Sequence, residues 1–370
     1  MSRLNQCLRG VRVLDLSSYL PGPFASLVLA DFGAQVLKIE PPVGDGMRVL
    51  GPREPDGTPT FHAALNAGKT ICRLDLKSEE GRNRLLDLVR DADVLIEGFR
   101  PGVMERLCLS WEDLRVWNPA LIYCSISGYG VGGPMEQAAG HDGNYLAMAG
   151  VLHRNGKPPR FFDPPIADMT SGLYAVIAIL GALQARRCDG KGCHIDLGIA
   201  DVAMPLQAFQ VAALDTVGSP PAETTYLNGG AAYYRIYATR DDRHVMLGAV
   251  EQKFWRCFCE AAGRPDWMVR QNEPLPQTAL IDDIADYFVQ LTAADAMERF
   301  AASDCCVSLV LDLAEAVATP HHTARGVVRR TPRGRLQVLF PARVDDEAPV
   351  LRTDFIETEE AGWACGTSPA

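Results

Sequence analysis

Alternating apolar and amphipathic segments at the start of the chain constrain the fold more than any other feature. Residues 11–16 (VRVLDL) are apolar enough for a buried strand, Pro23 opens an amphipathic segment that stops at Gly33, and residues 35–40 form a second strand-like run. Proline in the first turn and glycine just past the last turn are usual helix ends. Strand, helix and strand in this order predict a βαβ unit, whose two strands run parallel.

The same alternation continues to residue 127. Further strands are predicted at residues 71–76, 93–97 and 121–127, and a helix capped by Ser78 separates the first two of them. Strands that alternate with helices predict a parallel sheet that is covered on both faces. The expected fold class is therefore α/β, with a Rossmann-like large domain.

The turn after the first strand argues against a dinucleotide site. Residues 17–23 are SSYLPGP, without the GxGxxG glycines that let a pyrophosphate approach the backbone closely. We therefore expect a Rossmann-like sheet that does not bind NAD.

The pattern changes after residue 150. A proline-rich basic loop at 155–165 leads into a long helix predicted from about residue 170 to 186, and a loop at 218–230 is rich in Gly, Pro and Thr. Residues 233–250 then predict a β-hairpin, followed by helices. The predicted division is a large domain over 1–217, a smaller α+β domain over 218–325 and a C-terminal segment over 326–370.

Composition excludes several classes of protein. A formal net charge of −10 argues against a nucleic-acid-binding protein, which needs a basic face. No segment reaches the ~18 uninterrupted apolar residues of a membrane span, and the longest apolar run, 173–183, predicts a buried helix. The N-terminus lacks the apolar core of a secretory signal. Eleven cysteines without CxxC spacing are typical of a reducing compartment, so we expect a cytoplasmic protein without a metal site.

Five segments together resemble a known family, the family III CoA-transferases and α-methylacyl-CoA racemases. The resemblance implies a large α/β domain built from both chain ends, a smaller domain, and an interlocked homodimer. It also implies an acyl-CoA thioester as substrate in fatty acid metabolism, with no cofactor beyond the CoA that the substrate carries. The segments are LRGVRVLD at 8–15, GAQVLKIEPP at 33–42, IEGFRPG at 96–102, SGYG at 127–130 and GKG at 190–192.

Two further segments favour the racemase branch of this family. GHDGNY at 140–145 resembles the racemase histidine motif, and GAVEQKFW at 248–255 resembles its glutamate motif. Asp168 resembles the acidic residue that both branches use. The resemblance implies a racemase or epimerase of 2-methylacyl-CoA thioesters. The alternatives are a CoA-transferase in which Asp168 forms covalent intermediates and a CoA-binding protein without activity.

Racemisation beside a thioester needs a base on one face of the α-carbon and an acid on the other. His141 and Asp168 are the expected pair, and a positioned acid or base contributes roughly 10²–10⁴-fold. Histidine suits this task because its ordinary pKa is near neutrality. Backbone amides near the start of the helix after Asp168 are candidate donors to the enolate oxygen. Glu251 is expected to orient and charge-stabilise His141, and Asp142 is a weaker candidate for polar support.

Each of these residues also has a purely structural interpretation. His141 is then an ordinary loop histidine, and Asp168 and Glu251 cap the helices that follow them. For Asp168 the two roles are compatible, because a helix N-terminus favours a carboxylate.

Basic residues after predicted strands are candidates for the phosphates of CoA. Arg100 and Arg106 lie around a loop that contains proline, and Lys38 ends a strand. Ligands of open α/β sheets bind at this edge, and arginine binds phosphate oxygens bidentately. Lys69 and Tyr129, in segments that resemble the family, complete the expected CoA contacts.

Overall fold

The computed structural model describes residues 3–363 of the 370-residue chain. The chain forms two compact units, which are described separately here. The first is built from the described parts of 1–149, 163–206 and 319–370, and the second from 150–162 and 207–318. The boundaries near residues 206 and 318 lie earlier than the predicted 217 and 325.

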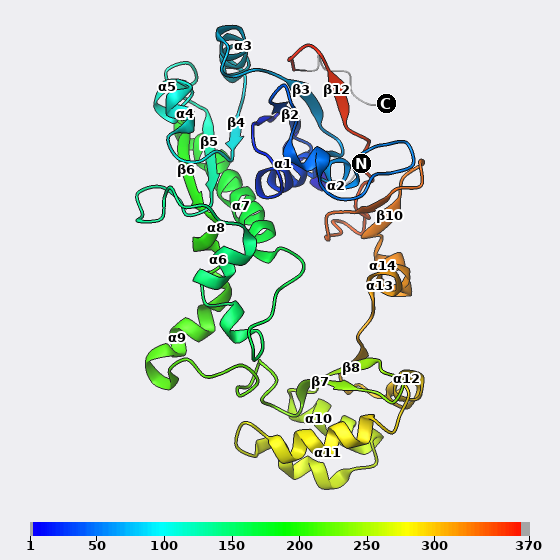
Figure 1. The fold of residues 1–370 in the computed structure, drawn as a ribbon. Helices are drawn as coiled ribbons and strands as arrows, with labels where there is room; N and C mark the ends of the chain where they lie inside the picture. Colours follow the sequence, from blue (N-terminus) through cyan, green and yellow to red (C-terminus); the bar gives the residue numbers. More distant parts are fainter. Residues whose placement is uncertain (1–2, 364–370) are drawn as a thin grey trace. The chain divides into compact units, whose positions relative to one another are not determined.

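The first unit contains a seven-stranded sheet in the order β12-β3-β2-β1-β4-β5-β6. All neighbouring strands in this sheet pair in parallel, as the alternation of strands and helices predicted. β12 lies beside β3 (Figure 1), so both ends of the chain contribute to one sheet. The strands are β1 (Arg12–Asp15), β2 (Gln35–Glu40), β3 (Thr70–Arg73), β4 (Val94–Glu97), β5 (Ile122–Ser127), β6 (Cys193–Gly198) and β12 (Ile356–Thr358).

Helices cover this sheet because its strands are apolar on both sides. Alternate strand residues, among them Leu14 and Leu95, share a core with Leu85 and Leu88 of α3 (Glu79–Arg90). As predicted, Ser78 caps α3, and its hydroxyl accepts a hydrogen bond from the Gly81 amide at 3.0 Å. The other helices of this unit are α1 (Pro21–Asp31), α2 (Thr60–Asn66), α4 (Val103–Arg106), α5 (Trp111–Leu114), α6 (Asp142–Met148), α7 (Ile166–Asp189), α8 (Ile199–Val202) and α14 (Pro320–Arg325).

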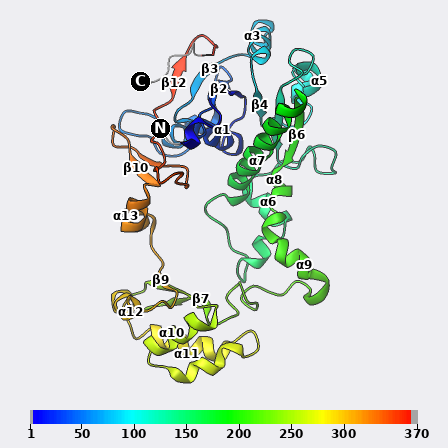
Figure 2. The same ribbon diagram turned by 180° about the vertical axis from the view of Figure 1, so that it is seen from behind.

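α7 packs against α1 and against β5 and β6 (Figure 2). Gly172 permits the close approach to α1, since a Cβ there would lie 2.8 Å from the Pro21 carbonyl oxygen. The prediction of a buried helix is correct for this side only, because Leu173, Tyr174 and Ile177 on α7 are exposed. By length and composition α7 could cross a membrane, but one such helix is weak evidence because core helices pass the same test.

The second unit is built around an aromatic core. The predicted hairpin is present as antiparallel β7 and β8, and β9 completes a three-stranded sheet. Trp255 of α10, Phe288 of α11 and Trp267, which lies between these two helices, are fully buried beside this sheet. The elements of this unit are α9 (Ala208–Val217), β7 (Tyr234–Ala238), β8 (His244–Gly248), α10 (Gln252–Ala261), α11 (Thr278–Phe288), α12 (Ala293–Phe300), β9 (Val307–Leu309) and α13 (Leu313–Ala318).

Short elements complete the fold. A two-stranded antiparallel ribbon in the first unit joins β10 (Val328–Arg330) to β11 (Leu336–Val338). The 3₁₀ helices are η1 (Arg3–Gln6), η2 (Gly46–Val49), η3 (Leu152–Arg154), η4 (Pro205–Gln207) and η5 (Pro265–Asn272).

Candidate functional site

His141 and Asp168 lie at the starts of two helices that are tied together. His141 immediately precedes α6, and Asp168 lies in the first turn of α7. The link between them is the buried side chain of Asp142, whose Oδ1 accepts hydrogen bonds from the Ala167 amide at 2.8 Å and the Asp168 amide at 3.1 Å. The structure therefore brings the histidine and the aspartate of the sequence prediction to two adjoining helix starts.

The carboxyl group of Asp168 lies in an environment that favours its protonated form. Burial, and then the negative charge of Asp142, raise the pKa of Asp168 to about 6. A carboxyl group with this pKa is mostly ionised at neutral pH but gains a proton easily, so it can serve as base or as acid. The side chain is not a simple helix cap, because the N-cap position of α7 belongs to Pro165.

The backbone around His141 is fixed while its side chain is exposed. The His141 amide donates to Asn144 Oδ1 at 3.1 Å, and its carbonyl accepts from the Asn144 amide at 2.8 Å. An exposed histidine on a fixed backbone can meet a substrate from a defined direction.

The enolate donors that the sequence analysis expected at the start of the helix are already in use. The amides of Ala167 and Asp168 both donate to Asp142. That expectation is therefore corrected: these two amides hold α7 against α6, and an oxyanion must find other donors.

Two tyrosines join the end of β5 to this site. Tyr129 follows β5, and its ring meets the ring of Tyr145 in α6 edge to face at 5.2 Å. Burial, and then the charges of Asp168 and Tyr129, raise the pKa of Tyr145 to about 12, while Arg100 acts in the opposite direction. The charges of Asp168 and Arg100 therefore act on the Tyr145 hydroxyl group in opposite directions.

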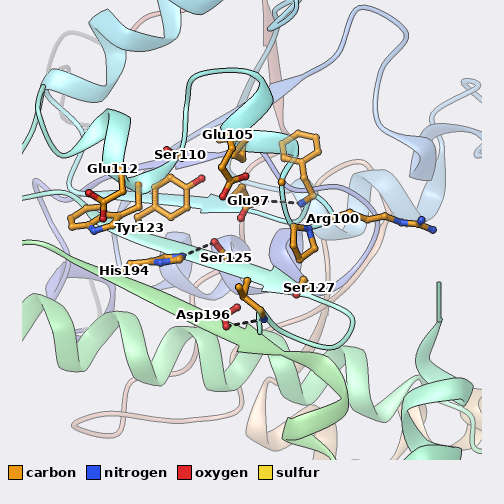
Figure 3. A pocket seen from close by; sticks show the side chains of 16 residues that line it. Glu97, Arg100, Glu105, Ser110, Glu112, Tyr123, Ser125, Ser127, His194 and Asp196 are labelled. Atoms are coloured by element: carbon orange, nitrogen blue, oxygen red, sulfur yellow. Dashed lines mark hydrogen bonds between the residues drawn. The ribbon is translucent and has the colours of Figure 1, made fainter. Parts of the chain in front are cut away.

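Arg100 and Arg106 are exposed at the carboxyl end of β4, where the sequence predicted them. Arg106 is the last residue of α4. The Arg100 side chain extends away from Glu97 and Glu105 (Figure 3). Both guanidinium groups are accessible to an anionic ligand.

Lys38 and Lys69 are in a different position, which corrects the prediction that they contact phosphate. Both side chains are completely buried. Lys38 Nζ lies 2.7 Å from the Ser17 carbonyl oxygen and 3.0 Å from Asp45 Oδ2. Lys69 Nζ donates to the Pro23 carbonyl at 2.8 Å and to Ser26 Oγ at 2.7 Å. Both amino groups are therefore occupied by partners in the interior around β1 and are not exposed to a ligand at the surface.

Glu251 lies in the second unit, directly before α10. Its side chain is exposed and makes no capping hydrogen bond, so the interpretation as a helix cap is wrong. Its expected support of His141 stays a prediction.

The sequence analysis missed a polar pocket at the ends of β4, β5 and β6. This pocket of about 180 Å³ is lined by Glu97, Ser125 and His194, among others (Figure 3). Glu97 accepts a hydrogen bond from the Phe99 amide at 2.8 Å, and Ser125 Oγ lies 2.9 Å from His194 Nε2. Polar residues within three adjacent strands that otherwise read as apolar, Glu97, Ser125 and His194, were the signal that could have identified it.

The charge around Glu97 is unbalanced. Burial raises the pKa of Glu97 to about 7 and outweighs the hydrogen bonds from Ser125 and Phe99, which lower it, while the negative charges of Glu105 and Asp196 add smaller increases. Among the residues that the structure describes, no group of three or more His, Cys, Asp or Glu side chains is placed to hold a metal ion.

Comparison with known proteins gives a consistent result across nearly the whole chain. Residues 8–354 match the family described as CoA-transferase family III. The human α-methylacyl-CoA racemase is 35% identical over 331 residues, covering 86% of this chain and 81% of that protein. An acetyl-CoA:oxalate CoA-transferase from Acetobacter aceti is 32% identical over 330 residues, covering 86% and 84%. The crystal structure of a CAIB/BAIF family protein from Brucella suis superimposes with a TM-score of 0.83 at 29% identity, covering 95% of this chain and 96% of that one.

Proposed function

Because the chain belongs to CoA-transferase family III, whose members resembling it include both racemases and transferases, we propose that it racemises 2-methylacyl-CoA thioesters. The observation that carries this proposal is the Asp142 link, which holds the starts of α6 and α7 together. A transferase needs only the nucleophile Asp168. A two-base racemase needs both His141 and Asp168, and the link supports this proposal because it keeps the two residues at adjoining helix starts.

The reaction moves one proton off the α-carbon and another onto it. In one direction the neutral imidazole of His141 takes the α-proton, and the electron pair passes to the thioester oxygen as an enolate. Protonated Asp168 then delivers a proton to the opposite face, and the reverse reaction exchanges the two roles. The pKa of about 6 for Asp168 suits this exchange, because both protonation states are accessible near neutral pH.

Binding of the CoA part is assigned to Arg100 and Arg106. Their exposed guanidinium groups can form charge-assisted, bidentate hydrogen bonds with phosphate. Arg100→Ala should raise KM for the thioester more than it lowers kcat, as expected for an interaction that ground state and transition state share. An unchanged KM would remove Arg100 from the site.

A homodimer is part of the proposal. The exposed apolar residues Leu173, Tyr174 and Ile177 give α7 a surface suited to a second copy. Light scattering should show a mass twice the 40.3 kDa of one chain. A stable and active monomer would contradict this.

The decisive experiment separates racemase from transferase. One epimer of a 2-methylacyl-CoA is incubated with the enzyme in D₂O without any acceptor acid. The wild type should invert the α-carbon and introduce deuterium there. His141→Ala and Asp168→Asn should each lose inversion by at least about 10²-fold, whereas His321→Ala, an exposed histidine on α14, should not.

The transferase alternative predicts a different pattern. The α-carbon would gain no deuterium, His141→Ala would remain active with an acceptor acid, and hydroxylamine would trap an adduct at Asp168. That pattern would replace the racemase proposal with the transferase one.

A further inference from the structure

Tyr145 holds the backbone on both sides of His141. Its hydroxyl group donates a hydrogen bond of 2.8 Å to the Gly140 carbonyl, just before the histidine. Its own amide donates to the His141 carbonyl at 3.2 Å. One residue therefore fixes the two consecutive peptide groups that flank the histidine Cα.

The tyrosine ring fits between backbone segments that have no side chains. A Cβ on Gly128 would lie 2.6 Å from the Tyr145 hydroxyl oxygen, and a Cβ on Gly140 would lie 2.7 Å from Tyr145 Cε1 and 2.9 Å from the Tyr129 hydroxyl oxygen. Distances below 3 Å leave no room for larger residues. Tyr145 is 6% exposed, and the two glycines and Tyr129 confine its ring.

The hydroxyl group of Tyr145 remains a donor under all ordinary conditions. Burial and the nearby Asp168 raise its pKa to about 12, so the proton stays on the oxygen at neutral pH. Its acceptor is an uncharged carbonyl. The bond therefore does not change with the protonation state of the catalytic pair.

We propose that Tyr145 is a positioning residue that holds His141 in place for proton transfer through its hydrogen bond to the Gly140 carbonyl. This inference rests on the proposed function, because it gives Tyr145 a role in one of the two proton transfers. Asp168 does not depend on this bond, since Asp142 holds the backbone amide of Asp168 instead. Loss of the tyrosine hydroxyl should consequently slow proton transfer at the face of the α-carbon that His141 serves and leave proton transfer at the other face unchanged.

Tyr145→Phe removes the single oxygen and keeps the ring. Each epimer is incubated separately in D₂O, and deuterium is measured early in the substrate that has kept its configuration. The epimer that loses this exchange in His141→Ala is the one that His141 serves. In Tyr145→Phe, exchange of that epimer should fall about tenfold, because small displacements of a catalytic group are costly. Exchange of the other epimer and KM should each stay within about twofold of wild type, since Asp168 keeps its own support.

Tyr237→Phe is the matched control. Tyr237 is also buried and its hydroxyl also donates to a backbone carbonyl, that of Ala232 at 2.6 Å, but it lies in the aromatic core of the second unit. It should leave both exchange rates as in the wild type. Gly140→Ala is a second test, because its Cβ would displace the Tyr145 ring and should produce the same one-sided loss even if Tyr145→Phe does not fold.

The outcomes are distinguishable. If Tyr145→Phe lowers the α-proton exchange of both epimers equally, or lowers neither, the role of Tyr145 is overturned. The racemase proposal would remain intact. If the wild type exchanges no α-proton at all, the proposed function fails, and the Tyr145 inference fails with it because there is no proton transfer to support.

Discussion

The carboxyl edge of the seven-stranded sheet buries charge in two different ways. Around β1 and β2, Lys38 and Lys69 lie within reach of acidic partners: Lys69 Nζ is 3.4 Å from Asp15 Oδ2. Burial alone would raise the pKa of Asp15, but the two ammonium groups lower it to about 2. Around β4 to β6, the charged side chains that act on Glu97 are those of Glu105 and Asp196, both acidic. The pKa of Glu97 rises to about 7, with burial as the main cause.

The two sides differ in whether the buried carboxyl group has cationic partners: Asp15 has Lys38 and Lys69, and Glu97 has none among its charged neighbours. On the first side Asp15 stays ionised across the physiological range because its pKa is lowered to about 2, whereas burial lowers the pKa of Lys69 to about 7. Glu97 has a pKa of about 7, and Asp168, in the first turn of α7, has one of about 6, so both carboxyl groups can exchange protons near neutral pH. Groups with such shifted pKa values are typical of functional sites. We infer that the paired carboxylate of Asp15 stabilises the sheet, and that the carboxyl groups of Glu97 and Asp168, which have no cationic partner, are free to take part in proton transfer.

The largest expected effect is a loss of folding stability when one of the cations beside Asp15 is removed. Lys69→Met removes the ammonium group that contacts Asp15 and Ser26. Removing one partner of a buried ion pair costs about 3–5 kcal/mol, because the other charge stays buried. Urea unfolding at pH 7 should show this loss.

The control for this substitution is an exposed lysine. Lys77→Met changes a side chain on the surface and should alter stability by no more than about 0.5 kcal/mol. A loss below about 1 kcal/mol for Lys69→Met would mean that the network around Asp15 is not a stabilising one.

A smaller effect of opposite sign is expected on the second side. Because the pKa of Glu97 is raised on folding from an ordinary value near 4.3 to about 7, its contribution to stability is complete below pH 4.3 and declines as the pH rises to 7. Glu97→Gln still offers an oxygen to the Phe99 amide but cannot ionise. It should be more stable than wild type at pH 8, by about 3.6 kcal/mol at most, and nearly equal near pH 4.5.

Unfolding measured from pH 4.5 to pH 8 tests this directly. Glu112→Gln, an exposed residue at the same pocket, should keep the wild-type profile. If Glu97→Gln is less stable than wild type at pH 8, the ionised Glu97 carboxylate has stabilising partners in the folded protein. The contrast between Glu97 and Asp15 would then be wrong.

Much of the first unit was predictable because strands leave a local pattern. The predicted strand at 35–40 coincides with β2 (Gln35–Glu40), and the one at 93–97 exceeds β4 by a single residue. The long helix was predicted from about residue 170 but begins at Ile166. Its first turn was missed because a proline-rich loop leads directly into it, and proline commonly precedes or opens a helix.

The candidate site was predictable residue by residue but not as an arrangement. Motifs pointed to His141 and Asp168, yet the bond from Asp142 to the Asp168 amide joins residues 26 positions apart. No local pattern shows such a contact. Lys38 was misjudged for a related reason. Its place at a strand end was correct, but its ion pair with Asp45 in the following loop, which buries it, depends on the tertiary fold.

The smallest predicted effect tests whether the charge of Asp142 tunes Asp168. Asp142→Asn keeps an oxygen that can accept from the Ala167 and Asp168 amides but removes the charge that helps to raise the pKa of Asp168. Asp168 must be ionised to act as a base, so activity falls as the pH drops through its pKa of about 6. Without the neighbouring charge this pKa should decrease, and the acid limb of kcat/KM should move to lower pH. The shift should be below about one unit, worth about 1.4 kcal/mol, because burial is the larger cause and remains. Asp189→Asn is the control: it makes the same change at the far end of α7, where Asp189 Oδ1 accepts from the Lys191 amide, and should leave the profile unchanged. An acid limb that stays in place or moves to higher pH in Asp142→Asn would show that Asp142 acts only by joining the two helices.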